Sequence, residues 1–104
     1  MNQEYETTIM ELIVHAGDAR SLATQAIRSA RKGNFAEAEE LISQCDEAMI
    51  AAHEAQTGLI RSELEGKPVA VTLLMVHAQD HVMNSMTVID LAKEMIAMME
   101  EKSV

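Results

Sequence analysis

The chain has 104 residues, of which 48% are hydrophobic and only two, Tyr5 and Phe35, are aromatic. Its 17 acidic residues outnumber 8 basic ones, giving a net charge of −9 at neutral pH. Nucleic-acid binding requires clustered Lys and Arg against the phosphates, so this charge balance excludes a nucleic-acid partner. The scarcity of aromatic residues and of Gly and Pro disfavours β-rich folds. We expect one all-α domain spanning residues 1–104.

The sequence also indicates where the protein works. No uninterrupted apolar run approaches the roughly 20 residues of a membrane span, and residues 1–6 lack the basic-then-apolar pattern of an export signal. The single cysteine, Cys45, has no internal disulfide partner, which fits a reducing compartment. Cys45 falls on an apolar stripe at helical spacing, which predicts a small buried side chain rather than a reactive thiol. We expect a cytoplasmic protein that does not insert into the membrane.

Helix-breaking residues interrupt the chain at two interior places, Gly33-Asn34 and residues 66–68. The stretch before Gly33 repeats apolar residues at steps of three and four, the period of a helix face. Gly33 is the predicted C-cap of this helix, and Asn34 the predicted N-cap of the next. The second stretch has the same period and is predicted to end near Gly66. Pro68 is predicted to open the third helix.

Three helices of about 30 residues each are much longer than average and need partners along their whole length. Short connections make sequential helices antiparallel, so we expect an up-down-up three-helix bundle. The third helix is apolar around much of its circumference. One stripe is expected to face the bundle core and a second stripe, on the far side, to mediate self-association. The expected core stripe is Leu73, Leu74, Val76, Val88, Leu91, Met95 and Met98, and the second is Met75, Val82, Met86, Ile89 and Ile96.

A small basic patch, formed by Arg28, Arg31 and Lys32, precedes Gly33. Cations at the end of a helix complement its dipole, which is one interpretation of the patch. A basic docking spot for another protein is the alternative.

Four polar side chains interrupt the apolar stripe of the third helix. His77, Asp80, His81 and Asn84 stand in the i, i+3, i+4, i+7 relation and therefore share one helix face. Burying such groups costs several kcal/mol unless each finds a partner, so nothing in folding alone requires them there. A hydrogen-bonded network that fixes helix register is one interpretation, and a functional site is the other.

The functional interpretation has two forms. His77, Asp80 and His81 have the spacing of helical metal ligands, but H-x-x-D-H lacks the glutamate base of hydrolytic zinc sites. Alternatively, one imidazole is a nucleophile that accepts a phosphoryl group and passes it on. The chain contains no glycine-rich nucleotide-binding motif, so a phosphoryl group must come from another molecule. His15 and His53 lack such a cluster and are expected to pack between helices.

Residues 76–83, V-H-A-Q-D-H-V-M, closely resemble the active-site helix of the lactose/cellobiose-type enzyme IIA of the bacterial phosphoenolpyruvate-dependent sugar phosphotransferase system. Residues 16–21, 33–38 and 52–57 also resemble that family, in order and at similar spacing. The resemblance thus covers nearly the whole chain. It implies a homotrimer of three-helix subunits whose third helices pack centrally.

The resemblance also implies roles for individual residues. His77 matches the phosphorylated histidine, which takes phosphate on Nε2 from the phosphocarrier protein HPr and passes it to a cysteine of the IIB component. Asp80 matches the residue that meets its two symmetry mates around a divalent cation, expected to be Mg²⁺. Such an ion would relieve the repulsion of three converging carboxylates. Gln79 and His81 are expected to support the phosphate or the partner.

The sugar served by such a relay is a disaccharide of the cellobiose/chitobiose or lactose type. Ala78 and residues 87–94 resemble the cellobiose/chitobiose branch more closely. Two other functions remain open from the residues themselves. One is a structural bundle in which His77, Asp80 and His81 hold a metal without group transfer, and the other is a helical adaptor with acidic faces.

Overall fold

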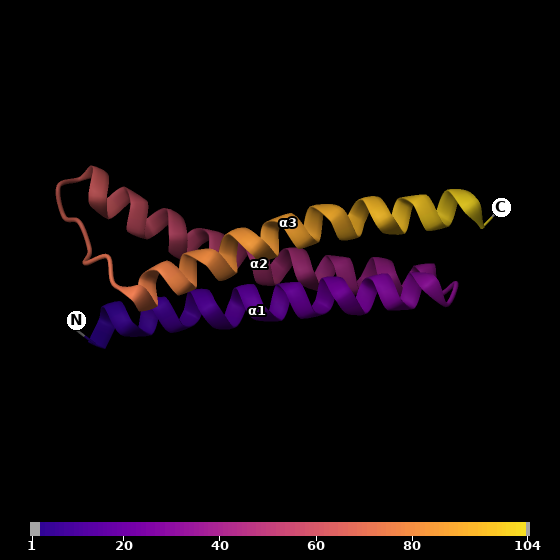
Figure 1. Ribbon diagram of the computed structural model, residues 1–104, viewed down its shortest axis with the longest axis horizontal. Coiled ribbons are helices and arrows are strands. Elements are labelled where there is room, and N and C mark those ends of the chain that lie inside the picture. The colour runs from indigo at the N-terminus through magenta and orange to yellow at the C-terminus, as the bar shows by residue number, and fades with distance from the viewer. Residues whose placement is uncertain (1–2, 104) are drawn as a thin grey trace.

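The computed structural model describes residues 3–103, which form three long helices. They are α1 (Gln3–Arg31), α2 (Phe35–Leu64) and α3 (Leu73–Lys102). α1 and α3 run in one direction, and α2 runs in the opposite direction (Figure 1). Together they form a rod of 54 × 21 × 20 Å. α1 packs along both other helices, whereas α2 and α3 contact each other much less. The expected all-α, up-down-up three-helix bundle is confirmed.

Glycine forms the turn between α1 and α2 as predicted. Gly33 has a φ of 82°, the left-handed conformation that a side chain disfavours. Its N–H donates to the Ala30 carbonyl at 2.9 Å, and the Asn34 N–H donates to the Ser29 carbonyl at 2.9 Å. These two bonds close the end of α1 with the hydrogen-bond pattern of a glycine C-cap. Asn34 occupies the N-cap position of α2, but its side chain makes no capping hydrogen bond there.

The predicted start of the third helix is wrong. α3 begins at Leu73, and Pro68 lies in the extended connection that precedes it. The cap is Thr72, whose hydroxyl oxygen accepts from the Met75 N–H at 3.2 Å. This bond satisfies one of the free N–H groups of the first turn, which proline does not do for its helix. The Tyr5 hydroxyl donates to the Ala70 carbonyl and so ties the connection to α1.

The core is built largely from small side chains. α1 buries five alanines in succession at helical spacing, namely Ala16, Ala19, Ala23, Ala26 and Ala30. Cys45 of α2 is fully buried, and its thiol donates to the Ala19 carbonyl at 3.1 Å. Burial, with a smaller contribution from Asp46, raises the pKa of this thiol to about 11. The prediction of a small buried cysteine is therefore confirmed.

The predicted orientation of α3 is wrong, because the stripe expected outside is buried and the stripe expected in the core is exposed. The stripe expected on the far side packs in the core, where Met75, Val82, Ile89 and Ile96 are buried. The stripe expected in the core faces outward, and the exposed fraction is 85% for Leu73, 53% for Leu91 and 61% for Met98. The outward stripe also carries the polar side chains, which a single copy cannot bury without partners. α3 is thus oriented to bury the stripe that contains no charged or imidazole group.

Candidate functional site

Two imidazoles lie edge to face on the outer surface of α3. His77 is exposed and His81, one helical turn later, is half-buried. Their Nε2 atoms are 3.1 Å apart, and the ring centroids are 4.5 Å apart with an interplanar angle of 87°. The i, i+4 spacing in the sequence predicts this pairing, because such residues are neighbours on a helix. The structure thus brings His77 and His81 together.

The short distance between the two Nε2 atoms restricts where the protons are. A hydrogen bond between them needs one nitrogen to carry the proton and the other to offer its lone pair. When His81 carries the proton on Nε2, its N–H donates to the single in-plane lone pair of His77 Nε2. A neutral His77 then carries its proton on Nδ1. In this state His77 Nε2 is unprotonated, and its lone pair can act as a nucleophile once the bond from His81 opens.

Asp80 and Asn84 lie on the same outer face of α3 and are exposed. Within residues 3–103, no hydrogen bond or ion pair engages the Asp80 carboxylate. Its two oxygens are the kind of ligand that Mg²⁺ and other hard cations prefer. The next carboxylate along α3 is Asp90, ten residues farther on, so near His77 the α3 helix of one copy supplies only Asp80. The residues therefore fit an ion only if other copies bring further carboxylates to it.

Gln79 is placed away from His77. Its side-chain oxygen accepts from Gln56 Nε2 at 2.7 Å, and its own amide donates to Met75 Sδ at 3.7 Å. Gln79 is half-buried and links α3 to α2. The sequence analysis did not single out Gln56. Gln56 falls in one of the segments that carry the family resemblance, but no spacing rule connects it to Gln79.

The remaining candidates have weaker geometry. In the described part of the chain, no three His, Cys, Asp or Glu side chains gather as metal ligands, which does not favour a metal held by His77, Asp80 and His81 of one copy. His15 is half-buried, as expected for a packing residue. His53 is exposed on α2, so the expectation that it packs between helices is wrong.

Between residues 3 and 103, no helix has both the length and the apolar character to cross a bilayer.

Comparison with known proteins identifies the family. The family model for the PTS system lactose/cellobiose-specific IIA subunit matches residues 7–100 of this sequence. This chain belongs to that family. The lichenan-specific phosphotransferase enzyme IIA component of Bacillus subtilis is 46% identical over 101 residues, covering 97% of this chain and 92% of the relative. The N,N'-diacetylchitobiose-specific EIIA component of Escherichia coli is 40% identical over 99 residues, covering 95% and 85%.

Solved structures of IIA subunits share the fold. The cellobiose-specific enzyme IIA from Bacillus anthracis superposes with a TM-score of 0.94 at 40% identity, covering 99% of this chain and 94% of that one. The IIA subunit in the IIA(chitobiose)–HPr complex of Escherichia coli gives a TM-score of 0.84 at 38% identity, covering 99% and 100%. The resemblance drawn from the sequence is confirmed. A phosphotransfer role in the sugar phosphotransferase system follows for this IIA subunit.

Proposed function

We propose that this IIA subunit relays a phosphoryl group through Nε2 of His77 during sugar uptake. The observation that carries the proposal is the exposed His77 ring with its Nε2 held against Nε2 of His81. HPr is the proposed donor, because a related IIA subunit has been solved in complex with HPr. A cysteine of the IIB component is the proposed acceptor. Both exchanges take place in the cytoplasm.

In the first step, the hydrogen bond between His81 and His77 opens, and the freed lone pair on His77 Nε2 attacks the phosphorus of phosphorylated HPr. A new P–N bond forms on His77 while the bond between phosphorus and HPr breaks, and the HPr group that carried the phosphate leaves with the electron pair. In the second step, a IIB thiolate attacks the same phosphorus and the His77 imidazole leaves. His81 supports both steps by holding the His77 ring in position. Gln79 is the second proposed support, acting toward the partner, because its bond to Gln56 holds it away from His77.

The outward face of α3 is the proposed site of trimer formation. It exposes several large apolar side chains on a strongly acidic chain, and such faces mark interfaces. Three copies packed through α3 would bring three Asp80 carboxylates to one axis. Because converging carboxylates repel, a divalent cation such as Mg²⁺ is proposed to bind there and supply positive charge.

The sugar class is proposed from the relatives. Curated members of the family are named for lichenan, cellobiose, lactose and N,N'-diacetylchitobiose. A disaccharide of the cellobiose/chitobiose type is the proposed sugar, with a lactose-type disaccharide as the alternative. The subunit itself passes on phosphate and need not contact the sugar.

A phosphorylation assay tests the relay. Purified protein incubated with enzyme I, HPr and phosphoenolpyruvate is expected to gain one phosphoryl group that is stable in alkali and lost in acid. The His77→Ala variant is expected to lose this adduct entirely, because the accepting nitrogen is gone. Mass spectrometry of alkaline samples measures the gain.

The matched control is His53→Ala, which removes an exposed imidazole from α2. This variant is expected to be phosphorylated like the original protein. An adduct that survives in His77→Ala would show that another residue accepts the phosphate and would overturn the assignment.

A further inference from the structure

The two nitrogens that face each other in the histidine pair are also two potential ligands for one metal ion. His77 Nε2 and His81 Nε2 are 3.1 Å apart, on rings that stand at 87° to each other. Two nitrogens bound to one tetrahedral Zn²⁺, each at roughly 2.0–2.1 Å, lie about 3.3–3.4 Å from each other. Histidines at positions i and i+4 of a helix bind zinc in this way in helical zinc motifs. The spacing of the pair is thus close to that of a chelate.

Chelation uses one lone pair from each ring, so both Nε2 atoms must be unprotonated. Each neutral ring then carries its proton on Nδ1, and the pair as a whole loses no proton. The hydrogen bond between the rings is exchanged for two bonds to the ion. Small rotations about χ2, a torsion with broad minima in histidine, direct both lone pairs to one point.

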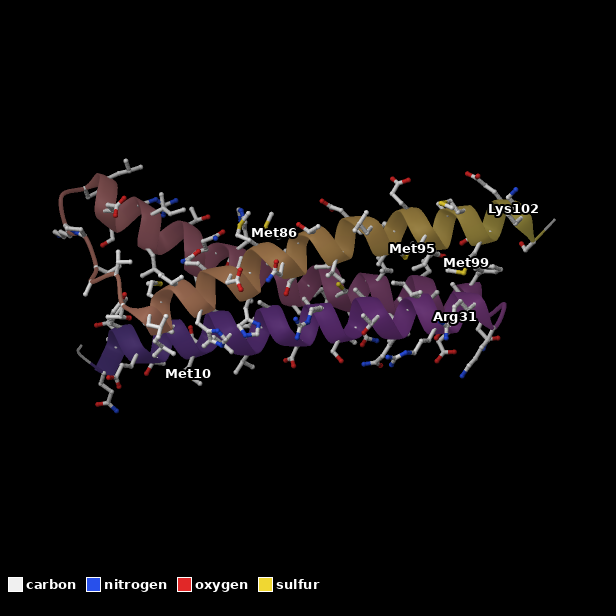
Figure 2. All side chains as sticks on the ribbon, viewed as in Figure 1. Met10, Arg31, Met86, Met95, Met99 and Lys102 are labelled. Carbon is white, nitrogen blue, oxygen red and sulfur yellow. The ribbon has the colours of Figure 1, made fainter. Side chains whose placement is uncertain are left out.

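The surroundings of the pair admit a cation. His77 is exposed and His81 is half-buried. A nitrogen that a partner protein reaches in the proposed relay is also open to a hydrated ion, whether in one copy or in a trimer. The net charge of −9 attracts cations. Arg31 and Lys102 lie at the far end of the rod (Figure 2), and Lys102 is 25 residues beyond His77, roughly 37 Å along α3.

The ligands select the kind of metal. Imidazole nitrogen suits Zn²⁺ and similar transition metals, whereas Mg²⁺ prefers oxygen ligands. Within residues 3–103, Asp80 does not gather with the two histidines as a third ligand, so water fills the remaining positions around an ion at the pair. Such an ion is distinct from the divalent cation proposed between the Asp80 carboxylates of different copies.

We propose that the His77–His81 pair binds Zn²⁺ and that the bound ion blocks phosphoryl transfer. The lone pair of His77 Nε2 bonds either to zinc or to phosphorus, but not to both. Zinc therefore prevents transfer from HPr, and a phosphoryl group on His77 prevents chelation. The block rests on the proposed relay, whereas zinc binding itself does not.

Isothermal titration calorimetry of the full chain with Zn²⁺ tests the site, with excess Mg²⁺ present to occupy oxygen ligands. One zinc per chain is expected. His77→Ala and His81→Ala are each expected to weaken binding about a hundredfold, because the second ligand of a chelate acts at high effective concentration. The matched controls are His53→Ala, which removes an exposed imidazole from α2, and Asp80→Asn. Both are expected to bind zinc like the original protein.

Single-turnover transfer from phosphorylated HPr, freed of enzyme I, tests the block. Zn²⁺ at about ten times its measured Kd is expected to slow phosphorylation about tenfold, since about a tenth of the chains stay free of the ion. A chelator is expected to restore the rate. His81→Ala keeps the accepting nitrogen but not the chelate, so its transfer is expected to be insensitive to the same zinc. This variant also controls for zinc bound by HPr.

Three results would overturn the proposal. They are equal zinc affinity in His81→Ala and the original protein, equal loss of affinity in Asp80→Asn and the histidine variants, and equal inhibition of His81→Ala and the original protein. A chain that binds zinc through the pair but is never phosphorylated would count against the relay and against the block with it. A chain that is phosphorylated on His77 but binds no zinc would refute this proposal alone.

Discussion

In the proposed relay, His77 and His81 would act as a pair, because the hydrogen bond between their Nε2 atoms links the state of one ring to that of the other. In one of the two tautomeric arrangements that the 3.1 Å contact allows, the Nε2–H of His81 donates to the His77 lone pair. Once His77 carries phosphate on Nε2, that lone pair is used, and the His81 N–H is free to donate to a phosphoryl oxygen. The same side chain would therefore position the His77 ring before transfer and bind the phosphoryl group after it.

Cys45 makes the stability of the protein fall at alkaline pH. Its thiol has a pKa of about 11 in the folded protein against an ordinary value of 9.0. The unfolded chain therefore releases this proton at lower pH than the folded chain. The stabilisation is complete below pH 9 and is lost as the pH rises to about 11.

We expect the free energy of unfolding of the original protein to fall more steeply between pH 9 and 11 than that of Cys45→Ala. Over this range the free energy of unfolding should decrease by about 2–3 kcal/mol more in the original protein than in the variant. Urea denaturation at stepped pH measures it. The variant starts from a lower stability because a buried sulfur is removed, so the slopes are compared and not the absolute values. Parallel curves would contradict the argument.

At the scale of the elements, the start of α3 depends on one hydroxyl. Thr72 accepts from the Met75 N–H and precedes His77 by little more than one turn. Pro68 lies four residues before this cap, in the connection. The first turn of α3, next to the proposed phosphate site, is therefore fixed by the cap and by the buried side chain of Met75.

We expect Thr72→Ala to lower the free energy of unfolding by about 1 kcal/mol, the usual cost of losing an N-cap hydrogen bond. Urea denaturation measures the change. Thr87→Ala is the matched control, because that exposed hydroxyl donates to a carbonyl within the same helix and caps nothing. An unchanged stability in Thr72→Ala would show that packing alone fixes this end of α3.

Helix positions were predictable to different degrees. The end of α1 at Gly33 and the end of α2 near Gly66 follow from residues with φ of 82°, which the sequence marks plainly. The start of α3 was missed because Pro68 is compatible with a helix start but does not require one. A threonine followed by an apolar run is typical of an N-cap, and Thr72 has this pattern in the sequence.

At the scale of the whole molecule, the outward face of α3 combines apolar and polar groups that one copy leaves in water. Leu91 is 53% exposed and Asp80 shares its face. In the proposed trimer, burial of the apolar residues favours association while the three Asp80 carboxylates oppose it. A divalent cation would offset that repulsion.

We expect Asp80→Leu to keep the trimer and to make it insensitive to chelator. Replacing clustered buried charges with apolar side chains often stabilises an assembly, by about 1–4 kcal/mol. Analytical ultracentrifugation with and without EDTA measures the change, and the original trimer is expected to weaken in EDTA.

Asp90→Leu, another exposed aspartate of α3, is the control and is expected to keep the chelator sensitivity. Monomers in Asp80→Leu would show that the carboxylate contributes to assembly in another way.

The sequence by itself determined the number of helices, their direction, the buried Cys45 and the face shared by His77, Asp80 and His81, because these depend on periodicity and on local breakers. Only the tertiary structure decided which stripe of α3 faces the core. Both stripes are apolar at helical spacing, and in the structure the stripe without charged or imidazole groups packs against the buried face of α1. It likewise decided that Gln79 pairs with Gln56, since a contact between two helices has no signature in the spacing of either one.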